Sequence, residues 1–233
     1  HYPELLDWLV PVVSPMIGQA RRIKEELGNA TRVVLIGPCL AKKDEARRAE
    51  FGGDVDAVLS FQELDRWIEE DVYGWDDCPE EGICEASAAA SCFPLEGGLG
   101  QAAGRTVSDG ITVLSISGLE DCQKVLGDLA SDKSKHSERL LLEMFACRGG
   151  CINGPLMPRG TTELSRRRNM VEALAMLRTQ GTEKSCKAWW SGASEMLYRK
   201  FVPRPIRWIQ PSPEELTQIL AGTGKFSTAD ELN

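Results

Sequence analysis

Short apolar runs alternate along this chain with segments whose apolar residues recur at helical spacing. The apolar runs predict strands at Val33–Ile36, Val55–Ser60, Ile111–Ser117 and Leu140–Ala146. The predicted helices are residues 3–9, Pro15–Leu27 with Ser14 as its cap, one through Lys42, Phe61–Tyr73, Leu119–Leu129, Glu163–Leu177, Ser185–Lys200 and Glu214–Leu220. Strands that alternate with helices indicate an α/β fold with parallel sheets and βαβ crossovers.

The helical pattern is clearest in Phe61–Tyr73 and is lost in the stretch that follows. The apolar residues at helical spacing, which we expect in the core, are Leu64, Trp67, Ile68 and Val72. Residues 74–110 are rich in Gly, Ala, Ser and acids, and such long irregular stretches are usually functional or disordered. Cys78 and Cys84 in this stretch lack matching metal-binding partners, so we interpret them as free thiols.

Two cysteines directly follow the last predicted strand. Cys147 and Cys151 are separated by a short loop that contains Gly149 and Gly150. Open α/β sheets bind ligands on loops at the carboxyl ends of their strands. Thiolates this close suit a metal cluster, and paired glycines allow the backbone to approach an inorganic core and direct N–H groups at its sulfurs. The alternative is a strand-to-helix turn with two core cysteines, because this spacing is not a common zinc pattern.

A third cysteine, Cys39, follows the first predicted strand within the motif GPCLAKKDEA. Together, PCLAKKDEA and ACRGGCING resemble the cluster-binding domain of the iron-only (FeFe) hydrogenases, whose signatures have the form PCxAKKxE and ACxGGCxNG. The opening HYPELL with Ser14-Pro15 resembles the segment after that family's first cysteine motif, and SCFPLEGGL resembles its Phe…Gly-Gly loop. The likeness runs over residues 1–160 in the family's order.

The resemblance implies two lobes, each a small twisted parallel sheet flanked by helices, with the cluster in a cleft between them. In the family, four cysteines hold a 4Fe-4S cluster, and the last also bridges to a two-iron centre that carries CO and cyanide. Cys39 and Cys147 would then be cluster ligands and Cys151 the bridging ligand. Lys42 matches the lysine that hydrogen-bonds a cyanide, and this is its implied catalytic role. The residues expected to line the cofactor are Gly37, Pro38, Phe145, Gly149, Gly150 and Asn153.

The chain also departs from the pattern of hydrogenases that turn over hydrogen. Gly37 and Phe145 stand where those enzymes carry methionine, and Arg148 stands where proline is usual. Val10 aligns with a serine on the proton route, and Met16 with a glutamine. Valine cannot carry a proton, and each lost proton-transfer contact can cost about two to four orders of magnitude in rate. Fast hydrogen turnover is therefore not expected.

Composition narrows the class of protein further. The 233 residues are 42% hydrophobic, which suffices for one large domain or two small lobes. A net charge of −8 argues against nucleic acid or an anionic membrane as a primary partner, and no apolar run reaches the length of a membrane span. Eight cysteines without a secretory signal favour a reducing cytoplasm and thiolate ligands over a disulfide framework.

The sequence further predicts how the chain is divided. We expect residues 1–200 to form the cluster-binding domain, truncated on its N-terminal side because the opening falls inside a family motif. The family's fourth cysteine then precedes His1, so the cofactor is expected to be absent or incomplete in this piece. Residues 201–233 are expected to be a Pro-rich linker and short helix that lead to a downstream domain, and residues 229–233 resemble a segment of sensory members.

Three functions remain open from the sequence. The favoured hypothesis is a hydrogenase-like iron-sulfur domain of a hydrogen- or redox-sensing protein, signalling through a downstream domain of the same chain. The second is a working hydrogenase with an altered pocket. The third is a cubane-only domain for electron transfer or cluster handling. The expected electron donor is a ferredoxin-type protein or an N-terminal ferredoxin domain.

Overall fold

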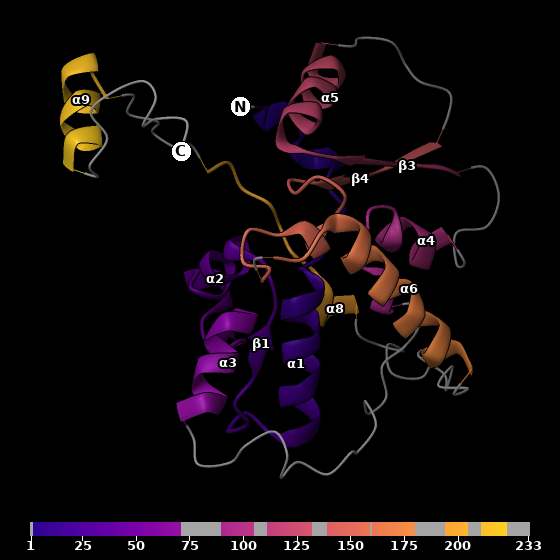
Figure 1. Cartoon of the computed structure of the whole chain (residues 1–233). Coiled ribbons are helices and arrows are strands. Elements are labelled where there is room, and N and C mark those ends of the chain that lie inside the picture. Colours follow the sequence, from indigo (N-terminus) through magenta and orange to yellow (C-terminus); the bar gives the residue numbers. More distant parts are fainter. Residues whose placement is uncertain are drawn as a thin grey trace. The chain divides into compact units, whose positions relative to one another are not determined.

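The computed structural model describes residues 2–70, 90–104, 111–131, 139–158, 160–179, 194–204 and 211–222. The chain forms two units, Tyr2–Phe201 and a second one that contains the residues from Val202 onward. The first unit holds two small parallel sheets with helices beside them (Figure 1). The predicted α/β fold with parallel sheets is therefore confirmed.

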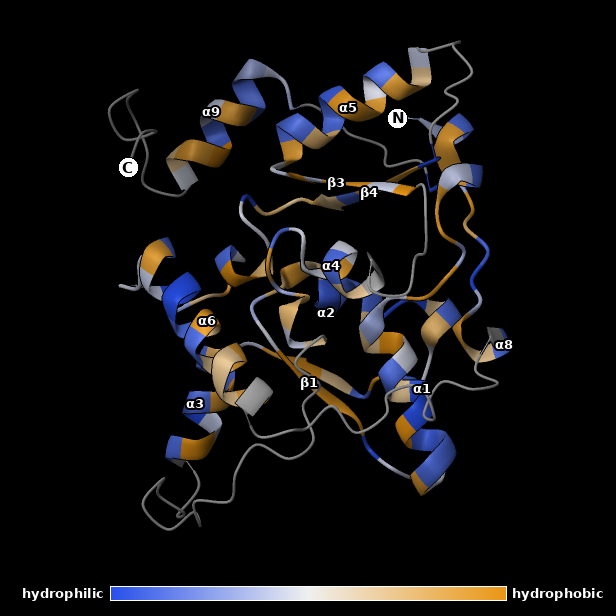
Figure 2. Ribbon diagram, turned by 90° about the vertical axis from the view of Figure 1, so that its right-hand side faces the viewer, coloured by the Kyte–Doolittle hydropathy of each residue, from blue (hydrophilic) through white to orange (hydrophobic). Residues whose placement is uncertain are grey.

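The first sheet pairs β1 (Val34–Ile36) with β2 (Ala57–Leu59) in parallel, with Val34 opposite Ala57. We call this sheet and its flanking helices the first lobe. Its other elements are α1 (Pro15–Leu27), α2 (Leu40–Ala46), the short η2 (Ala49–Phe51) and α3 (Phe61–Glu70). Both strands consist of hydrophobic residues (Figure 2), although Val34 and Ile36 of β1 are 44% and 42% exposed.

The core of the first lobe lies between α1 and the sheet. Its buried residues are Val13, Met16, Ile17, Ala20, Phe51 and Val55. The helix α1 has the predicted bounds, but the Ser14 side chain forms no capping hydrogen bond and its hydroxyl is buried without a partner. Instead, the carbonyl of Ser14 accepts the Gly18 N–H, so the cap acts through the backbone.

The second sheet pairs β3 (Ile111–Ser117) with β4 (Arg139–Phe145), from Ile111 opposite Arg139 to Ser117 opposite Phe145. We call this sheet and its helices the second lobe. The helices α5 (Leu119–Ser131) and α4 (Gly98–Gly104) contact both strands and lie on opposite faces (Figures 1 and 2). Short 3-10 helices, η1 (Pro3–Trp8) and η4 (Ala90–Cys92), pack against α5 and α4 respectively.

One predicted core residue is exposed. Leu64 and Ile68 of α3 are half-buried as expected, but the Trp67 side chain is 56% exposed. The sheet beneath α3 has only two strands of three residues, which cover too narrow a face of the helix to bury all three side chains. Val72 lies outside the described residues, as do Cys78, Cys84 and the chain's last eleven residues.

The segment after β4 returns to both lobes. It contains η5 (Cys151–Asn153), α6 (Glu163–Thr179) and α8 (Ser194–Leu197). The helix α8 falls within the predicted helix Ser185–Lys200, of which residues 185–193 lie outside the described residues. The end of α8 is fastened to the start of the chain, because Val13 N–H donates to the Leu197 carbonyl at 2.8 Å and Arg199 N–H donates to the Pro11 carbonyl at 3.0 Å.

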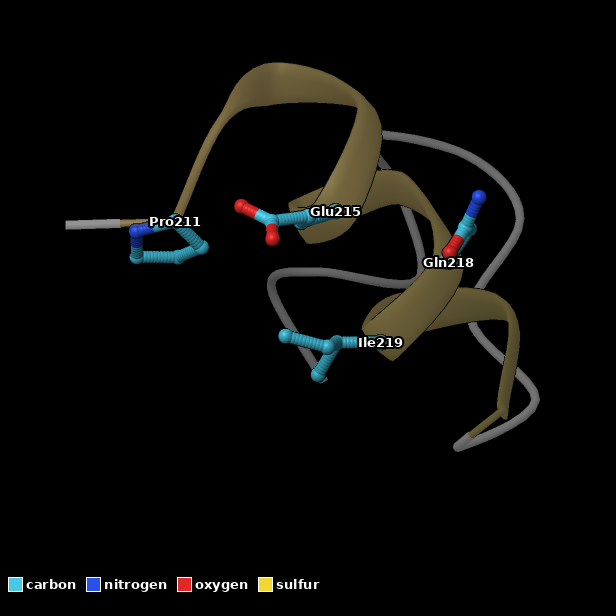
Figure 3. Close-up of a pocket in the computed structure, with 4 residues that line it drawn as sticks. All are labelled: Pro211, Glu215, Gln218 and Ile219. Atoms are coloured by element: carbon cyan, nitrogen blue, oxygen red, sulfur yellow. The ribbon is translucent and has the colours of Figure 1, made fainter. Parts of the chain in front are cut away.

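The second unit is described mainly through α9 (Pro213–Gly222), which has no buried residue. A shallow hollow on this unit is lined by Pro211, Glu215, Gln218 and Ile219 (Figure 3). This hollow holds no cysteine and no residue singled out by the sequence. Within the ranges described above, none of the helices has the length and apolar character required to cross a bilayer.

Candidate metal centre

Cys39 lies where β1 gives way to α2. Its backbone is extended, with φ −107° and ψ 112°, and it occupies the N-cap position of α2. Its thiol makes no capping hydrogen bond to the helix, and the residue is half-buried. The Cys39 sulfur is therefore not used by the helix that it precedes.

Cys147 and Cys151 lie on the loop that leaves β4, and both are free and half-buried. Between them, Gly149 and Gly150 have φ of +77° and +100°, which favours glycine over any other residue. A Cβ on Gly150 would lie 2.5 Å from the Pro94 carbonyl oxygen, because Leu95 pairs with Gly150 as an antiparallel bridge. The glycines are thus required for the close approach of another segment of the protein.

The N–H groups of both glycines are used within the protein. Gly149 N–H donates to Ser117 Oγ at 2.9 Å, and Gly150 N–H donates to the Cys147 carbonyl at 3.1 Å. The prediction that the two glycines direct N–H groups at cluster sulfurs is therefore wrong for this conformation. The sequence could not reveal this, because Ser117 is 32 residues away from Gly149.

The structure brings all three cysteines together. Burial raises the pKa of the Cys147 thiol, and the nearby Cys39 raises it further by repulsion between like charges. Burial likewise raises the pKa of Cys151, with further contributions from Cys39 and Cys147. These mutual effects indicate that Cys39 lies near Cys147 and Cys151, as the resemblance implies.

Backbone contacts join the segments that carry the cysteines. Leu156 N–H donates to the Pro38 carbonyl at 3.2 Å. A Cβ on Gly154 would lie 2.4 Å from the same carbonyl oxygen, so the two backbones touch at this point. The first lobe is thus joined to the loop of the second lobe one residue before Cys39 and three residues after Cys151.

The donor set fits an iron-sulfur cluster better than a single ion. Across the described ranges, no three Cys, His, Asp or Glu residues are close enough to hold one metal ion. A 4Fe-4S cluster takes its cysteine ligands on different irons, so its thiolates surround a space instead of meeting at a point. Gly37 lies two residues before Cys39, and a Cβ there would have no atom within 4 Å. The three thiols therefore fit the cluster as ligands, and their role as ligands remains a prediction.

Lys42 and Lys43 are both engaged in ion pairs. Lys42 Nζ lies 2.6 Å from Glu45 Oε2, and Glu45 is buried. The Lys42 charge also acts on Cys151, where it lowers the thiol pKa against the larger raising effects. The Lys43 side chain is only 20% exposed and lies 2.5 Å from the Glu63 carboxylate. Lys43 thus ties α2 to α3.

Asn153 has a structural partner on each side of its amide. Its Nδ2 donates to the Arg148 carbonyl at 3.0 Å, and its Oδ1 accepts from Arg166 Nε at 3.1 Å and from a terminal guanidinium nitrogen at 2.8 Å. In this structure Asn153 fastens the cysteine loop to α6. Nothing in the sequence singles out Arg166, whose neighbours on α6 are also arginines.

The other residues singled out by the sequence differ in their burial and in their contacts. Phe145 ends β4, and its carbonyl accepts Gly118 N–H at 2.9 Å and the Cys122 thiol at 3.4 Å. Val10 is 55% exposed, whereas Met16 is buried in the first-lobe core. Arg148, which replaces the usual proline, lies 3.3 Å from Asp121 and is 77% exposed.

A buried carboxylate holds the Phe…Gly-Gly segment beside the loop. Glu143 on β4 is only 6% exposed and accepts hydrogen bonds from the Leu99 N–H at 2.9 Å and the Gly100 N–H at 3.0 Å. The Ser115 hydroxyl donates to it at 2.9 Å. The start of α4 is therefore fixed by a charge from the sheet, a contact the sequence did not predict.

Comparisons with known proteins agree with this arrangement. One curated relative, the NADP-reducing hydrogenase subunit HndD of Solidesulfovibrio fructosivorans, is 28% identical, with 73% of this chain and 37% of the relative covered. Another, the periplasmic Fe hydrogenase large subunit of Nitratidesulfovibrio vulgaris, is 26% identical, with 68% of this chain and 48% of the relative covered. The chain thus spans less than half the length of either relative.

Solved structures share the fold at lower identity. An FeFe-hydrogenase structure from a study of oxygen inactivation superposes with a TM-score of 0.62 at 19% identity, covering 86% of this chain and 71% of that one. A variant of apo FeFe-hydrogenase HydA1 from Chlamydomonas reinhardtii gives a TM-score of 0.61 at 18% identity, covering 86% and 72%. These likenesses show the fold of the chain.

The family profile described as "Iron only hydrogenase large subunit, C-terminal domain" matches residues 1–113 and 107–155. The matched range contains Cys39, Cys147 and Cys151, which the structure brings together. This chain belongs to the family of the C-terminal domain of iron-only hydrogenase large subunits.

Proposed function

We propose that this chain is a hydrogenase-like iron-sulfur domain of a hydrogen- or redox-sensing protein. Its ligands are Cys39, Cys147 and Cys151, and its cofactor is a 4Fe-4S cluster, with a two-iron subcluster where the cofactor is complete. The proposal is carried by the three free, half-buried thiols that two lobes bring together beside open space at Gly37. Residues 1–200 form the cluster-binding domain, and the residues that follow connect it to a signalling domain.

The cluster, when bound, supplies electron transfer. The protein contributes the remaining features of the site. Burial keeps the free thiols of Cys147 and Cys151 protonated, so these thiols release their protons when they bind metal. Lys42, steadied by Glu45, offers N–H donors to an anionic ligand, which suits a lysine beside a cyanide-bearing centre. Gly37, Pro38 and Phe145 line the space beside the cysteines.

The sensing role rests on the departures from the pattern of active enzymes. Val10 cannot pass a proton, and Gly37 and Phe145 replace two methionines of the pocket. Slow chemistry at a site that keeps Cys39, Cys147 and Cys151 suits a domain that reports hydrogen or redox state. We infer a cytoplasmic protein with a ferredoxin-type donor, although one relative is named as periplasmic.

A working hydrogenase is the second candidate, because both curated relatives bear hydrogenase names. Hydrogen evolution by the cluster-loaded full-length protein with a reduced dye separates the two. A rate as high as that of ordinary hydrogenases would contradict the sensing role. A slow rate, with output that responds to hydrogen, supports it.

Cysteine replacement tests the ligand set itself. Cys39→Ser, Cys147→Ser and Cys151→Ser should each lower the iron and acid-labile sulfide retained after anaerobic reconstitution, because each removes a ligand. Cys122→Ser is the matched control, since this thiol is buried on α5 and bound to the Phe145 carbonyl. Equal iron in all four variants would refute the ligand assignment.

A further inference from the structure

A chain of two hydrogen bonds joins three distant segments at the cysteine loop. The Ser117 hydroxyl, at the end of β3, donates to Glu96 Oε2 at 2.7 Å. The Ser117 Oγ in turn accepts the Gly149 N–H at 2.9 Å. The hydroxyl has one proton, and a carboxylate can only accept, so the direction of both bonds is fixed.

Glu96 is held in place on either side along its own segment. Before it, the Pro94 carbonyl accepts the Ile152 N–H at 3.2 Å, and Leu95 forms the bridge with Gly150. After it, α4 begins on the buried carboxylate of Glu143. A Cβ on Gly150 would lie 2.7 Å from the Glu96 nitrogen, so the two backbones are in direct contact.

The other polar contacts of the loop named here involve its carbonyl groups and do not use the Gly149 N–H. Asn153 Nδ2 binds the Arg148 carbonyl, and an Arg167 guanidinium nitrogen reaches the Gly149 carbonyl at 3.4 Å. Both contacts fix carbonyl groups on the loop. Gly149 and Gly150 are glycines that could adopt many backbone conformations, and here both have positive φ. The hydrogen bond to Ser117 fixes the direction of the Gly149 N–H.

We propose that Glu96, acting through Ser117, is a positioning residue that fixes the turn between Cys147 and Cys151. It orients the Ser117 hydroxyl as an acceptor, and this in turn holds the Gly149 N–H. The two thiols on either side of the turn are thereby held ready for the cluster. The importance of this turn for cluster binding rests on the proposed function, whereas the effect of Glu96 on the conformation of the turn does not. A bond to a carboxylate is stronger than one to a neutral group, so the charge of Glu96 contributes to the hold.

The effect on the turn is tested in the metal-free protein by amide hydrogen exchange. Ser117→Ala should exchange the Gly149 amide about tenfold faster, the factor that corresponds to loss of a hydrogen bond of about 1.4 kcal/mol. Ser117→Thr, which keeps a hydroxyl, should restore slow exchange, and Glu96→Gln should give an intermediate rate. Ser131→Ala, which removes an exposed hydroxyl from α5, is the control. Exchange in Ser117→Ala as slow as in the unaltered protein overturns the proposal.

The reconstituted protein provides a second measurement, the reduction potential of the cluster, which a change in packing alone would not alter. Glu96→Gln keeps the size and hydrogen bonding of the side chain but removes a negative charge beside the loop. The cluster's reduction potential should therefore rise, because the reduced cluster carries more negative charge. Glu25→Gln, on the exposed face of α1, should leave the potential unchanged.

These measurements distinguish the positioning role of Glu96 from the proposed function. If Ser117→Ala changes the exchange of the Gly149 amide but the unaltered protein takes up no iron on reconstitution, the proposed function is refuted and the positioning role remains. Normal iron uptake, with exchange and potential unchanged in both Ser117→Ala and Glu96→Gln, refutes the positioning role alone.

Discussion

Glu63 links two helices of the first lobe through a single carboxylate. Lys43 binds it at 2.5 Å, and the Ser60 N–H and hydroxyl donate to it at 2.7 and 2.9 Å. These bonds, led by that of Lys43, lower the pKa of Glu63 from its ordinary 4.5 to about 2. A carboxyl with a lowered pKa stabilises the fold above its unfolded value, and this contribution disappears as the pH falls through the folded value.

Glu63→Gln should therefore lower the free energy of unfolding at neutral pH, and its deficit should vanish between about pH 4.5 and about pH 2. Urea unfolding across a pH series measures this difference. Glu69→Gln, an exposed position on the same helix, serves as the control with no such trend. A deficit that persists at pH 2 would show that the carboxylate charge is not the cause.

Val10 tests the proton route at a single position. In the cluster-loaded full-length protein, Val10→Ser should raise hydrogen evolution severalfold with iron content unchanged, because a hydroxyl both donates and accepts protons. The gain should be modest, since Gly37 and Phe145 also differ from active enzymes. Val12→Ser, at another exposed valine two residues away, should leave the rate unchanged. An equal gain in both variants would mean that polarity, and not the route, sets the rate.

At the scale of elements, the start of helix α4 is held by a residue of strand β4. Glu143 is buried and accepts the two N–H groups that open the helix, together with the Ser115 hydroxyl. Glu143→Ala leaves these donors buried without a partner, so we expect a loss of about 3 kcal/mol in the free energy of unfolding. Chemical denaturation measures this loss. Glu172→Ala, an exposed partner of Arg168, should change it by less than about 0.5 kcal/mol.

Elements with a regular apolar pattern were predicted well from the sequence. The bounds of β3 and α1 were predicted correctly, because their apolar residues follow the period of a strand and of a helix. The helix α4 was missed, since its sequence GLGQAAG has one large apolar residue and its first turn is fixed by Glu143, 44 residues from Leu99. Trp67 was misplaced because helical spacing does not tell how wide the supporting sheet is.

At the scale of the whole molecule, the sequence predicted which residues meet but not how they are held. The convergence of the three cysteines followed from family motifs and from their places at strand ends. Among the residues that fasten the loop, Glu96, Ser117 and Arg166 lie outside the motifs of Cys39, Cys147 and Cys151. Their contacts depend on the packing of distant segments, which leaves no local pattern in the sequence.

The junction between the lobes provides the last prediction. Gly154 has an ordinary backbone conformation, with φ −60° and ψ 155°, so alanine is allowed there by its own geometry. A Cβ would nevertheless lie 2.4 Å from the Pro38 carbonyl oxygen, a backbone atom that cannot turn aside. Gly154→Ala should therefore push the segment after Cys151 away from the segment before Cys39.

We expect Gly154→Ala to lose about 1–3 kcal/mol in the free energy of unfolding, the usual cost of overpacking, and to retain severalfold less iron after reconstitution. Gly222→Ala, at the end of α9, is the control, because a Cβ there has no atom within 4 Å and the residue lies outside the proposed site. It should leave both quantities unchanged. If Gly154→Ala instead keeps full stability and iron, the contact between Gly154 and Pro38 does not hold the cysteines together, because the added methyl group lies closest to the Pro38 carbonyl.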